Sequence, residues 1–375
     1  MKKSLFAGPA LLAAAALSFA GCAEPPGTGS STAPTAGPSS QASASTGAAD
    51  FKACMVSDSG GFDDKSFNQT SYKGLTDAKT TLAIETGQVE SSAAADYAKN
   101  IDSMVKADCN MIVTVGFLLS DATVAAAKAN PDIDFAIVDD NPASAKGLKN
   151  LKPLVFNTAE SSFMAGYLAA GSSKTGTVGT FGGLPIPTVT IFMDGFAQGV
   201  QYYNDQKSKS VKLVGWNPEN PKGGSFVPGD KPFENVAGGK QVATNLVSQG
   251  ADIIFPVAGP AGEGGLQVAK ASGGKVSAIW VDTDGCVSAE SYCSSLVSSV
   301  FKGMDVAVTQ AIKDSYEDKF DATAYVGTLE NEGTGLAPYH EFDSLVPADL
   351  KAEVDKIKAD IIAGTIKIDS ASQPK

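Results

Sequence analysis

Short apolar runs alternate with stretches of helical periodicity along most of the chain. The runs KACMVS, MIVTVG and DFAIVDD are rich in β-branched residues and predict buried strands. TLAIE is a further run of this kind, and helical patterns begin near Ser66 and Ala94 and continue in SDATVAAAKA. This βαβα order predicts a parallel sheet with helices on both faces.

A second series of the same kind starts in the middle of the chain. PLVFN leads into the apolar helical stretch SSFMAGYLAAGSS, after which GTVGTFG, VKLVGW, ADIIFPVAG and KVSAIWVDTD read as strands. Helices are predicted over residues 188–204 and within GKQVATNLVSQG and GEGGLQVAKAS. Two series of similar size predict two doubly wound α/β lobes.

The C-terminal part of the chain has to be assigned to one of these lobes. Residues 158–284 contain the second series, whereas the first series needs the remainder to reach the size of a full domain. We therefore assign 51–157 with 285–375 to lobe one and 158–284 to lobe two. The chain then crosses between the lobes several times, which predicts a hinge and a cleft.

The N-terminal segment lacks this alternation. Two lysines precede an apolar run that ends in FAGC, which predicts a lipoprotein signal over residues 1–22 with Cys22 as the lipid-modified residue. Residues 23–50 are almost all Gly, Ser, Thr, Pro, Ala and Gln and predict a flexible tether. The protein would thus be anchored to the extracytoplasmic face of the cell membrane. Phe19, where an aliphatic residue is usual, leaves a secretory signal cut near Ala20 as the alternative.

Length and charge narrow the class of protein. A chain of 375 residues, 43% hydrophobic and 19% charged, is ordinary for a globular protein of two domains. Its formal net charge of −12 argues against nucleic acid as a partner, because neutralising phosphates needs a basic face.

Four cysteines follow the predicted lipidation site. An exported chain meets oxidising conditions, so an even number of cysteines favours disulfides. Cys286 and Cys293 would close a short loop, and Cys54 and Cys109 lie at or beside the start of two strands that could be neighbours. We favour two disulfides, with four free thiols as the alternative.

Polar residues and glycines come directly after the predicted strands. They are Asp58, Gly116, Asp139 with Asp140, the AGPAGEGG turn that contains Gly259, Asp282 with Asp284, and Lys302. Ligands of open α/β sheets bind beyond the carboxyl ends of the strands, so these residues are candidates for one binding site. Each aspartate could instead cap the helix that follows it, and the glycines could form a tight turn.

No catalytic or metal-binding motif accompanies these strand ends. The chain lacks HxxxH, GxSxG and the GK[ST] ending of a P-loop, and its single histidine, His340, does not complete a zinc-site spacing. Carboxylates accept bonds from hydroxyl and N–H groups, and aromatic side chains stack on a flat ring. We therefore predict a binding protein for a neutral polar ligand, without metal or cofactor, and not an enzyme.

One stretch brings these features together. VSDSGGFDDKSFNQTSYKGL, residues 56–75, strongly resembles the signature of the basic membrane protein family. These are lipoproteins of type I periplasmic-binding-protein fold that deliver purine nucleosides to an ABC importer. The resemblance continues through NPDIDFAIVDD, ESSFMAGYLAA, SQGADIIFPVAGPAGEGG, AIWVDTD and SSVFKGMDVAV. It implies the type I fold, a purine nucleoside as ligand and an ABC permease as partner.

The resemblance also implies roles for individual residues. Asp58 and Asn68 would bind polar edges of the nucleoside, and Phe67 would stack on one face of the purine. Asp139, preferred over Asp140, would accept bonds from ring N–H groups. The ribose hydroxyls would be held by Asp282 and Lys302 with Gly259 close by, and Gly116 of the matching VGF segment completes this set.

A second stacking aromatic is expected from a segment similar to FENVAGGK. Phe233 is our choice, although the family's aspartate is Asn235 here. The preceding insertion offers Trp216 and Phe226 as alternatives. Phe67 and Phe233 could each also be ordinary core residues.

The remaining charges of residues 56–75 have a structural interpretation. Asp63 and Asp64 precede a predicted helix and are expected to cap its positive end. Lys65 would be solvated or paired with them.

Two other functions stay open from the sequence. A receptor of the same fold for a sugar, an amino acid or another small polar ligand is the main alternative, because carboxylate–hydroxyl pairing does not exclude sugars. An extracellular nucleoside-processing enzyme or a surface adhesin is a third class, but no nucleophile–base pair in the sequence supports an enzyme.

Overall fold

The computed structural model describes residues 51–374. The predicted signal over residues 1–22, the modified Cys22 and the tether of residues 23–50 lie outside the described residues. Within residues 51–374, no helix combines the length and the apolar character needed to cross a bilayer.

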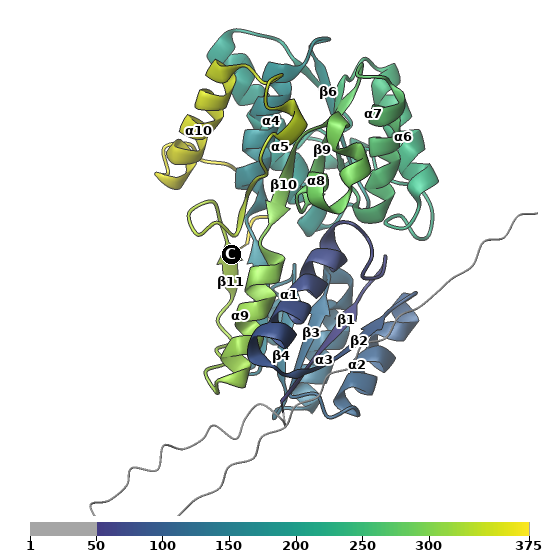
Figure 1. Ribbon diagram of the computed structural model, residues 1–375, viewed down its shortest axis with the longest axis vertical. Helices are drawn as coiled ribbons and strands as arrows, with labels where there is room; N and C mark the ends of the chain where they lie inside the picture. Colours follow the sequence, from purple (N-terminus) through teal and green to yellow (C-terminus); the bar gives the residue numbers. More distant parts are fainter. Residues whose placement is uncertain (1–50, 375) are drawn as a thin grey trace, which may run out of the picture. The chain divides into compact units, whose positions relative to one another are not determined.

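The first six-stranded sheet is built mainly from the N-terminal series. Its strands pair in parallel in the order β11-β5-β4-β3-β1-β2 (Figure 1). The strands are β1 (Lys52–Ser57), β2 (Glu85–Glu90), β3 (Met111–Val115), β4 (Asp134–Val138), β5 (Leu151–Phe156) and β11 (Tyr325–Gly327). The helices of this lobe are α1 (Phe67–Leu82), α2 (Tyr97–Val105), α3 (Ser120–Ala129) and α9 (Met304–Tyr316).

Side chains of these strands alternate between two apolar layers. Met55 and Val113 belong to the layer formed with α1 and α9, whereas Val56 and Ile112 belong to the layer formed with α2 and α3. This is the period of two that an extended strand imposes. Because both faces are covered, the inner strands β1, β3, β4 and β5 are apolar at most positions, as the sequence shows.

The second six-stranded sheet has the order β12-β10-β9-β8-β6-β7. Only β12 is antiparallel to its neighbour, β10, among the pairings in the described residues. The strands are β6 (Thr177–Gly182), β7 (Lys212–Val214), β8 (Ile253–Val257), β9 (Ser277–Asp282), β10 (Leu296–Lys302) and β12 (Thr334–Leu336). The helices are α4 (Thr158–Ser172), α5 (Pro187–Lys207), α6 (Val236–Ser248), α7 (Glu263–Ala271), the short α8 (Gly285–Ser288) and α10 (Ala348–Ile362).

The two sheets repeat one strand order. Read from the opposite edge, they are β2-β1-β3-β4-β5 and β7-β6-β8-β9-β10, each followed by a short edge strand. In the second lobe, α4, α5 and α10 contribute to one apolar layer, and α6 and α7 to the other. These are the two doubly wound α/β lobes that the sequence predicts.

The division of the C-terminal part between the lobes was predicted wrongly. Residues 285–375 were assigned as a whole to lobe one, but β10 pairs with β9 in the second sheet, and α10 packs on α4. Only α9 and β11 join the first lobe, through α1 and β5. The physical reason is that β10 completes the second sheet beside β9, so the chain returns to lobe one only after Lys302.

One strand was also displaced in the prediction. TLAIE, read as a strand, forms the end of α1 and the following turn, where Ala83 has a left-handed backbone with φ 54°. The strand is the next segment, ETGQVE, which pairs with β1 at the sheet edge. Because β2 has one exposed face and more polar residues, its hydrophobic signal is weaker than that of the helix end beside it.

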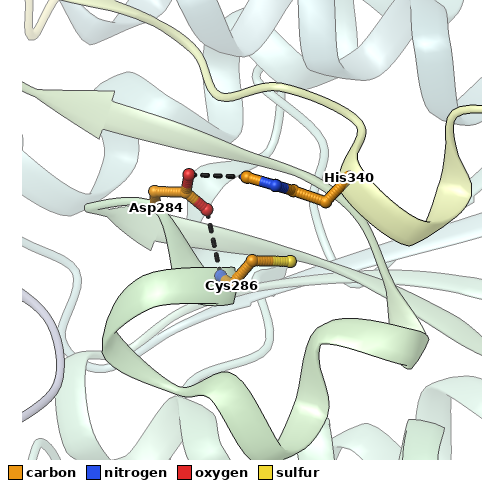
Figure 2. A group of neighbouring side chains, drawn as sticks. All are labelled: Asp284, Cys286 and His340. Atoms are coloured by element: carbon orange, nitrogen blue, oxygen red, sulfur yellow. Dashed lines mark hydrogen bonds and ion pairs between the residues drawn. The ribbon is translucent and has the colours of Figure 1, made fainter.

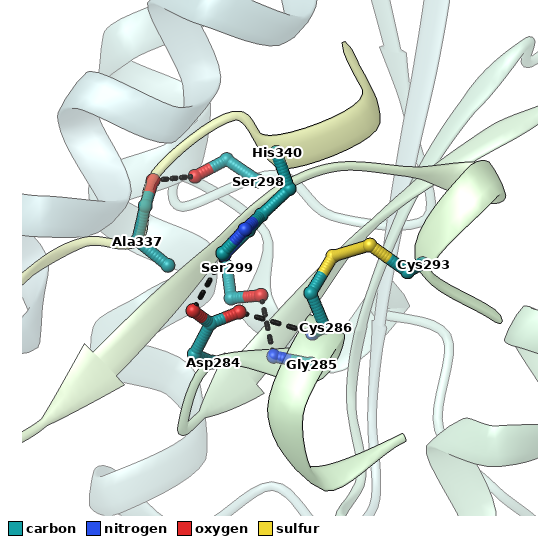
Figure 3. The surroundings of a disulfide bond; sticks show 8 residues. All are labelled: Asp284, Gly285, Cys286, Cys293, Ser298, Ser299, Ala337 and His340. Carbon is teal, nitrogen blue, oxygen red and sulfur yellow. Dashed lines mark hydrogen bonds and ion pairs between the residues drawn. A yellow bond between two sulfur atoms is a disulfide. The ribbon is translucent and has the colours of Figure 1, made fainter. Parts of the chain in front are cut away.

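Both favoured disulfides are present. Cys54 on β1 is joined to Cys109, which precedes the neighbouring strand β3. Cys286 on α8 is joined to Cys293 in the following 3₁₀ helix η6 (Glu290–Ser295), as Figure 3 shows.

Candidate functional site

A cavity lies between the carboxyl ends of the two sheets. Its empty volume, counted together with the open solvent at its mouth, is about 540 Å³. All nine residues predicted to bind ligand line it: Asp58, Phe67, Asn68, Gly116, Asp139, Phe233, Gly259, Asp282 and Lys302. Six of them were predicted from strand ends, whereas Phe67, Asn68 and Phe233 were implied by the family resemblance, and together they span positions 58 to 302 of the chain.

Lys302, the last residue of β10, is the central charge of the cavity wall. Its side chain is only 3% exposed, and its ammonium group pairs with Asp139 at the end of β4 and with Asp282 at the end of β9. The first carboxylate belongs to lobe one and the second to lobe two. Lys302 therefore connects the two lobes across the cavity.

Asp139 and Asp282 occupy equivalent places in the two lobes. Each follows or ends the fourth strand of its sheet order, and each has a left-handed backbone, with φ 65° and 68°. Non-glycine residues adopt this conformation at a cost, and aspartate is among those that tolerate it best. The shared conformation turns both carboxylates out of their strands and toward the same ammonium group.

Burial dominates the electrostatics of the Asp139 carboxyl group. It raises the pKa of Asp139 to about 6, against the opposing effect of the Lys302 charge. Burial also opposes protonation of Lys302, but the carboxylates of Asp139 and Asp282 outweigh it and raise the lysine pKa. The ion pair thus forms at neutral pH and leaves a site with little free positive charge.

Asp58 and Gly116, which directly follow β1 and β3 of lobe one, form a second polar corner. Burial, with the nearby carboxylates of Asp64 and Asp139, raises the pKa of Asp58 well above its usual value. Gly116 has φ 114°, and a Cβ atom there would lie 1.9 Å from Asp58 Oδ2. Only glycine therefore leaves room for the Asp58 carboxylate at this wall.

The loop between β1 and α1 joins the lobes at the mouth of the cavity. Ser66 Oγ donates to Asp282 Oδ2 at 2.8 Å, and Trp280 Nε1 donates to the carbonyl oxygen of Lys65 at 3.1 Å. The Lys65 ammonium lies 3.2 Å from Glu263 at the start of α7. The sequence predicted that Lys65 is solvated or paired with Asp63 or Asp64. This choice of partner was wrong, because the loop contacts lobe two and Lys65 pairs with Glu263 there.

Asp64 has the capping role expected from the sequence. Its carboxylate accepts bonds from the backbone N–H groups of Ser66, Asn68 and Gln69, at 2.9–3.0 Å. Burial raises the Asp64 pKa to about 6, against the opposing effect of these bonds. The cap fixes the first turn of α1, which carries Phe67 and Asn68.

Two oxygens in the cavity wall have unused hydrogen-bonding capacity within the described residues. Asn68 donates from Nδ2 to the carbonyl oxygen of Ser59 at 3.0 Å, while its buried Oδ1 has no hydrogen-bond partner. Asp282 Oδ1 lies 3.2 Å from the Lys302 ammonium, but it also lacks a hydrogen bond. Buried acceptors of this kind are costly unless a donor reaches them.

Aromatic rings provide the apolar part of the cavity wall. The Lys302 ammonium lies 4.9 Å from the ring centre of Phe67 and 5.0 Å from that of Phe192. Phe233 also lines the cavity, whereas its alternatives, Trp216 and Phe226, contact each other and line a different hollow. Of the three candidates for the second aromatic, the geometry therefore favours Phe233.

Several lining residues were not singled out from the sequence as ligand-binding candidates. They are Ser59, Asp64, Phe117, Thr188, Val189, Phe192, Val257 and Pro260. Thr188, Val189 and Phe192 lie on the first turns of α5, within the stretch PTVTIF, which follows β6. The rule that ligands bind beyond the carboxyl ends of strands could have identified them, because this helix also begins beyond such an end.

The lining groups suit binding rather than catalysis. They include four carboxyl groups, one ammonium group and four phenylalanine rings, and no histidine or cysteine is among them. Carboxylates and amide oxygens accept from hydroxyl and N–H groups, and the rings offer stacking surfaces. The excess of carboxyl groups disfavours an anionic ligand.

Comparison with known proteins agrees with this geometry. The model of the family described as "ABC transporter substrate-binding protein PnrA-like" matches residues 51–225 and 231–371. The chain is 29% identical over 343 residues to the "ABC transporter nucleoside-binding protein BmpA" of Lactococcus lactis subsp. cremoris, covering 86% of this chain and 90% of the relative. It is also 29% identical over 306 residues to "Basic membrane protein A2" of Borrelia garinii subsp. bavariensis, covering 81% and 84%.

A solved structure confirms the type I fold. An ABC transporter solute-binding protein from Aeropyrum pernix K1 superposes with a TM-score of 0.74 at 24% sequence identity, covering 84% of this chain and 92% of that one. The family is one of transporter substrate-binding proteins and not of enzymes. The chain therefore belongs to the PnrA-like family of ABC transporter substrate-binding proteins.

Proposed function

We propose that this substrate-binding protein takes up a purine nucleoside in the cavity between its lobes. The observation that carries the proposal is the convergence of aromatic rings and acceptor oxygens with spare hydrogen-bonding capacity on one buried space. A purine offers flat faces for Phe67 and Phe233, and its ring N–H groups suit the carboxylate of Asp139. The ribose hydroxyls would hydrogen-bond to Asp282, Lys302 and the backbone near Gly259. Asp58 and Asn68 would bind the remaining polar edges of the nucleoside.

The charge of the cavity separates a nucleoside from a nucleotide. Four carboxyl groups, those of Asp58, Asp64, Asp139 and Asp282, face a single ammonium group that is already paired. A phosphate would meet like charges in a buried space, where they are poorly screened. The relative from Lactococcus lactis is named a nucleoside-binding protein, which supports the same ligand class.

The rest of the proposal concerns delivery. The ligand-loaded protein would hand its nucleoside to an ABC permease, and lipidation at Cys22 would keep it at the extracytoplasmic face of the membrane. The 28 residues from 23 to 50, rich in glycine and serine, would act as the tether. Mass spectrometry of the membrane-bound protein tests the anchor, since a diacylglyceryl-modified Cys22 would be the first residue of the mature chain.

Isothermal titration calorimetry tests the ligand class. Adenosine, guanosine, inosine, uridine, ribose and adenosine monophosphate are titrated into the protein. We expect tight binding of at least one purine nucleoside, weaker binding of the monophosphate, and little response to ribose. Tight binding of ribose or an amino acid with no response to any nucleoside would assign the cavity to another ligand class.

A further inference from the structure

The only histidine of the chain lies beside a disulfide of the second lobe. His340 begins the 3₁₀ helix η7 (His340–Phe342), and its Nε2 lies 2.7 Å from Asp284 Oδ2 (Figure 2). Asp284 is the cap of α8, which carries Cys286. One ligand atom from each of Asp284, Cys286 and His340 lies within 4.8 Å of the others, and none of the three lines the ligand cavity.

We propose that reduction of the Cys286–Cys293 disulfide turns this cluster into a zinc site. The ligands would be the Cys286 and Cys293 thiolates, His340 Nε2 and the Asp284 carboxylate. Two sulfurs, one imidazole nitrogen and one carboxylate oxygen are a donor set that Zn²⁺ accepts in tetrahedral geometry. The proposal is independent of the nucleoside ligand.

The disulfide acts as a gate because it removes both sulfur ligands. In the oxidised protein Cys286 and Cys293 share an S–S bond and carry no thiolate charge, so only the histidine and aspartate remain as strong donors. The thiolate is the form of cysteine that binds metal. The oxidised protein should therefore bind Zn²⁺ weakly, and the reduced protein should bind it tightly.

The histidine is held in place by contacts that do not depend on the disulfide. Ala337, three residues before it, donates from its backbone N–H to the carbonyl oxygen of Ser299 at 2.8 Å. The Ala337 carbonyl oxygen accepts from Ser298 Oγ at 2.7 Å (Figure 3). His340 itself has a left-handed backbone with φ 44°. Backbone strain of this kind is found where the surroundings fix a side chain for a function.

The segment that carries the cysteines is also anchored at both ends. Near Cys286, the Gly285 N–H donates to Ser299 Oγ at 3.0 Å, and the Cys286 N–H donates to Asp284 Oδ1 at 3.0 Å. Near Cys293, Tyr292 Oη donates to Glu263 Oε1 at 2.8 Å. These bonds keep α8 and η6, and with them the two cysteines, in place when the S–S bond opens.

Zinc binding requires the donor atoms to rearrange, including the Cys293 sulfur, which lies one S–S bond beyond that of Cys286. Zinc bonds of about 2.0–2.3 Å in a tetrahedron place neighbouring donor atoms roughly 3.3–3.8 Å apart. The His340 and Asp284 donor atoms, now 2.7 Å apart, have to separate slightly, and the cysteine sulfurs have to rotate apart. The His340 side chain is 33% exposed, which leaves a path for the ion.

The chemistry balances with a thiol reductant. Two thiols of the reductant give two electrons and two protons to the S–S bond, yielding two cysteine thiols and one disulfide of the reductant. Binding of Zn²⁺ then displaces the two thiol protons, so metal uptake releases two protons per site. Exchange with a small-molecule disulfide would re-form the Cys286–Cys293 bond, convert that disulfide into two thiols with uptake of two protons, and release the ion.

Cobalt provides a direct readout of this site. The full chain, reduced with a phosphine that does not bind the metal, is titrated with Co²⁺ and followed by absorption. We expect one Co²⁺ per chain with thiolate-to-metal charge-transfer bands in the near ultraviolet and release of Co²⁺ on addition of Zn²⁺. The oxidised chain should show no such bands.

Variants assign the ligands. His340→Ala and Asp284→Asn should weaken Co²⁺ binding by at least about tenfold, and Cys286→Ser with Cys293→Ser should abolish the charge-transfer bands. That double variant retains Cys54 and Cys109 and thus reports any signal from the other reduced cysteines. Glu341→Gln, on the same turn as His340, is the matched control and should bind like the unchanged protein.

Three results would overturn the proposal. They are an absence of charge-transfer bands in the reduced chain, equal affinity of the oxidised and reduced chains, and an unchanged affinity in His340→Ala. Circular dichroism of each variant confirms that it is folded, so that a loss of metal binding reports on the ligands and not on unfolding.

Discussion

At the scale of single residues, the cavity combines aromatic rings with charged and polar groups that are costly to bury alone. A buried lysine is paired with two carboxylates, two aromatic rings lie near its ammonium group, and two acceptor oxygens still have hydrogen-bonding capacity to spare. A ligand that fills the space and donates to those oxygens would remove the cost. The site is thus prepared for a ligand with a flat ring and several donors.

Phe67 provides the first test of stacking. Phe67→Ala should weaken purine nucleoside binding by about 1–3 kcal/mol, or roughly 5- to 150-fold in Kd, because one face of the base loses its ring partner. Calorimetric titration measures the change. Phe226→Ala is the control, since Phe226 packs against Trp216 outside the cavity. An unchanged Kd for Phe67→Ala together with a lowered Tm would make Phe67 a core residue only.

Gly116 tests the position of the Asp58 carboxylate. In Gly116→Ala the new Cβ would overlap Asp58 Oδ2, so the carboxylate has to move, and we expect a loss of affinity of about tenfold or more. Gly147→Ala is a matched control, because Gly147 also has positive φ but has no atom within 4 Å of its ideal Cβ position. Equal affinities in the two variants would show that ligand binding does not depend on Asp58 at this place.

The raised pKa of Asp139 predicts opposite effects of pH on affinity and on stability. As pH falls through about 6, Asp139 gains a proton and no longer accepts from a ring N–H, so Kd should rise up to about tenfold per pH unit. The folded pKa lies above that of the unfolded chain, so this group's contribution to stability is greatest at low pH and is lost as pH rises through about 6.

Binding and unfolding measured between pH 7.5 and 5 test this prediction. Nucleoside affinity should fall toward pH 5, while the Asp139 contribution to the unfolding free energy of the ligand-free protein should rise. Asp139→Asn removes the titrating group and should flatten the pH dependence of Kd. A pH dependence that survives in Asp139→Asn would assign it to another carboxyl group.

At the scale of elements, the loop between β1 and α1 is the main contact between the lobes at the cavity mouth. Its Ser59, Lys65 and Ser66 bond to Glu234, Glu263 and Asp282 of lobe two. Glu263 is held from its other side by the Tyr292 hydroxyl group and stands at the positive end of α7. These contacts exist only while the lobes are closed, so they should slow the escape of a ligand.

Lys65→Ala should therefore release nucleoside faster. The Lys65–Glu263 pair is partly exposed, and such pairs contribute up to about 1 kcal/mol, so we expect a dissociation rate up to ~5-fold higher at low salt, with a smaller difference at high salt. Stopped-flow fluorescence measures the rate. Lys73→Ala is the control, because Lys73 pairs with Asp77 and Asp305 within lobe one. A control that accelerates release as much as Lys65→Ala would exclude a specific contact across the mouth.

The same elements show which features the sequence could predict. Strand ends were predictable because a parallel strand is an apolar run and its end is marked by the first polar residue, as at Asp58, Asp139 and Asp282. The role of Phe192 was not predictable, because an amphipathic helix shows the same sequence pattern whether its aromatic residue faces a core or a cavity. The placement of β10 was also hidden, since a strand's own residues do not specify which sheet it joins.

At the scale of the whole chain, the lobes are linked within residues 51–374 by three passages of the backbone. The chain leaves the first sheet after β5, returns to it after β10 for α9 and β11, and leaves it again before β12. Neither lobe is thus a continuous piece of sequence. Each sheet needs strands from distant parts of the chain, and the buried pair of Lys302 and Asp139 joins the two lobes.

This connectivity predicts that the lobes unfold together and that ligand stabilises both at once. Differential scanning calorimetry should show one transition, and nucleoside at about 100 times its Kd should add roughly 2.7 kcal/mol, moving the transition upward by about 5 °C. Phe67→Ala at the same nucleoside concentration should show a smaller upward shift, because its Kd is weaker. Two transitions, of which nucleoside moves only one, would show that the lobes fold independently and that the cavity is formed by a single lobe.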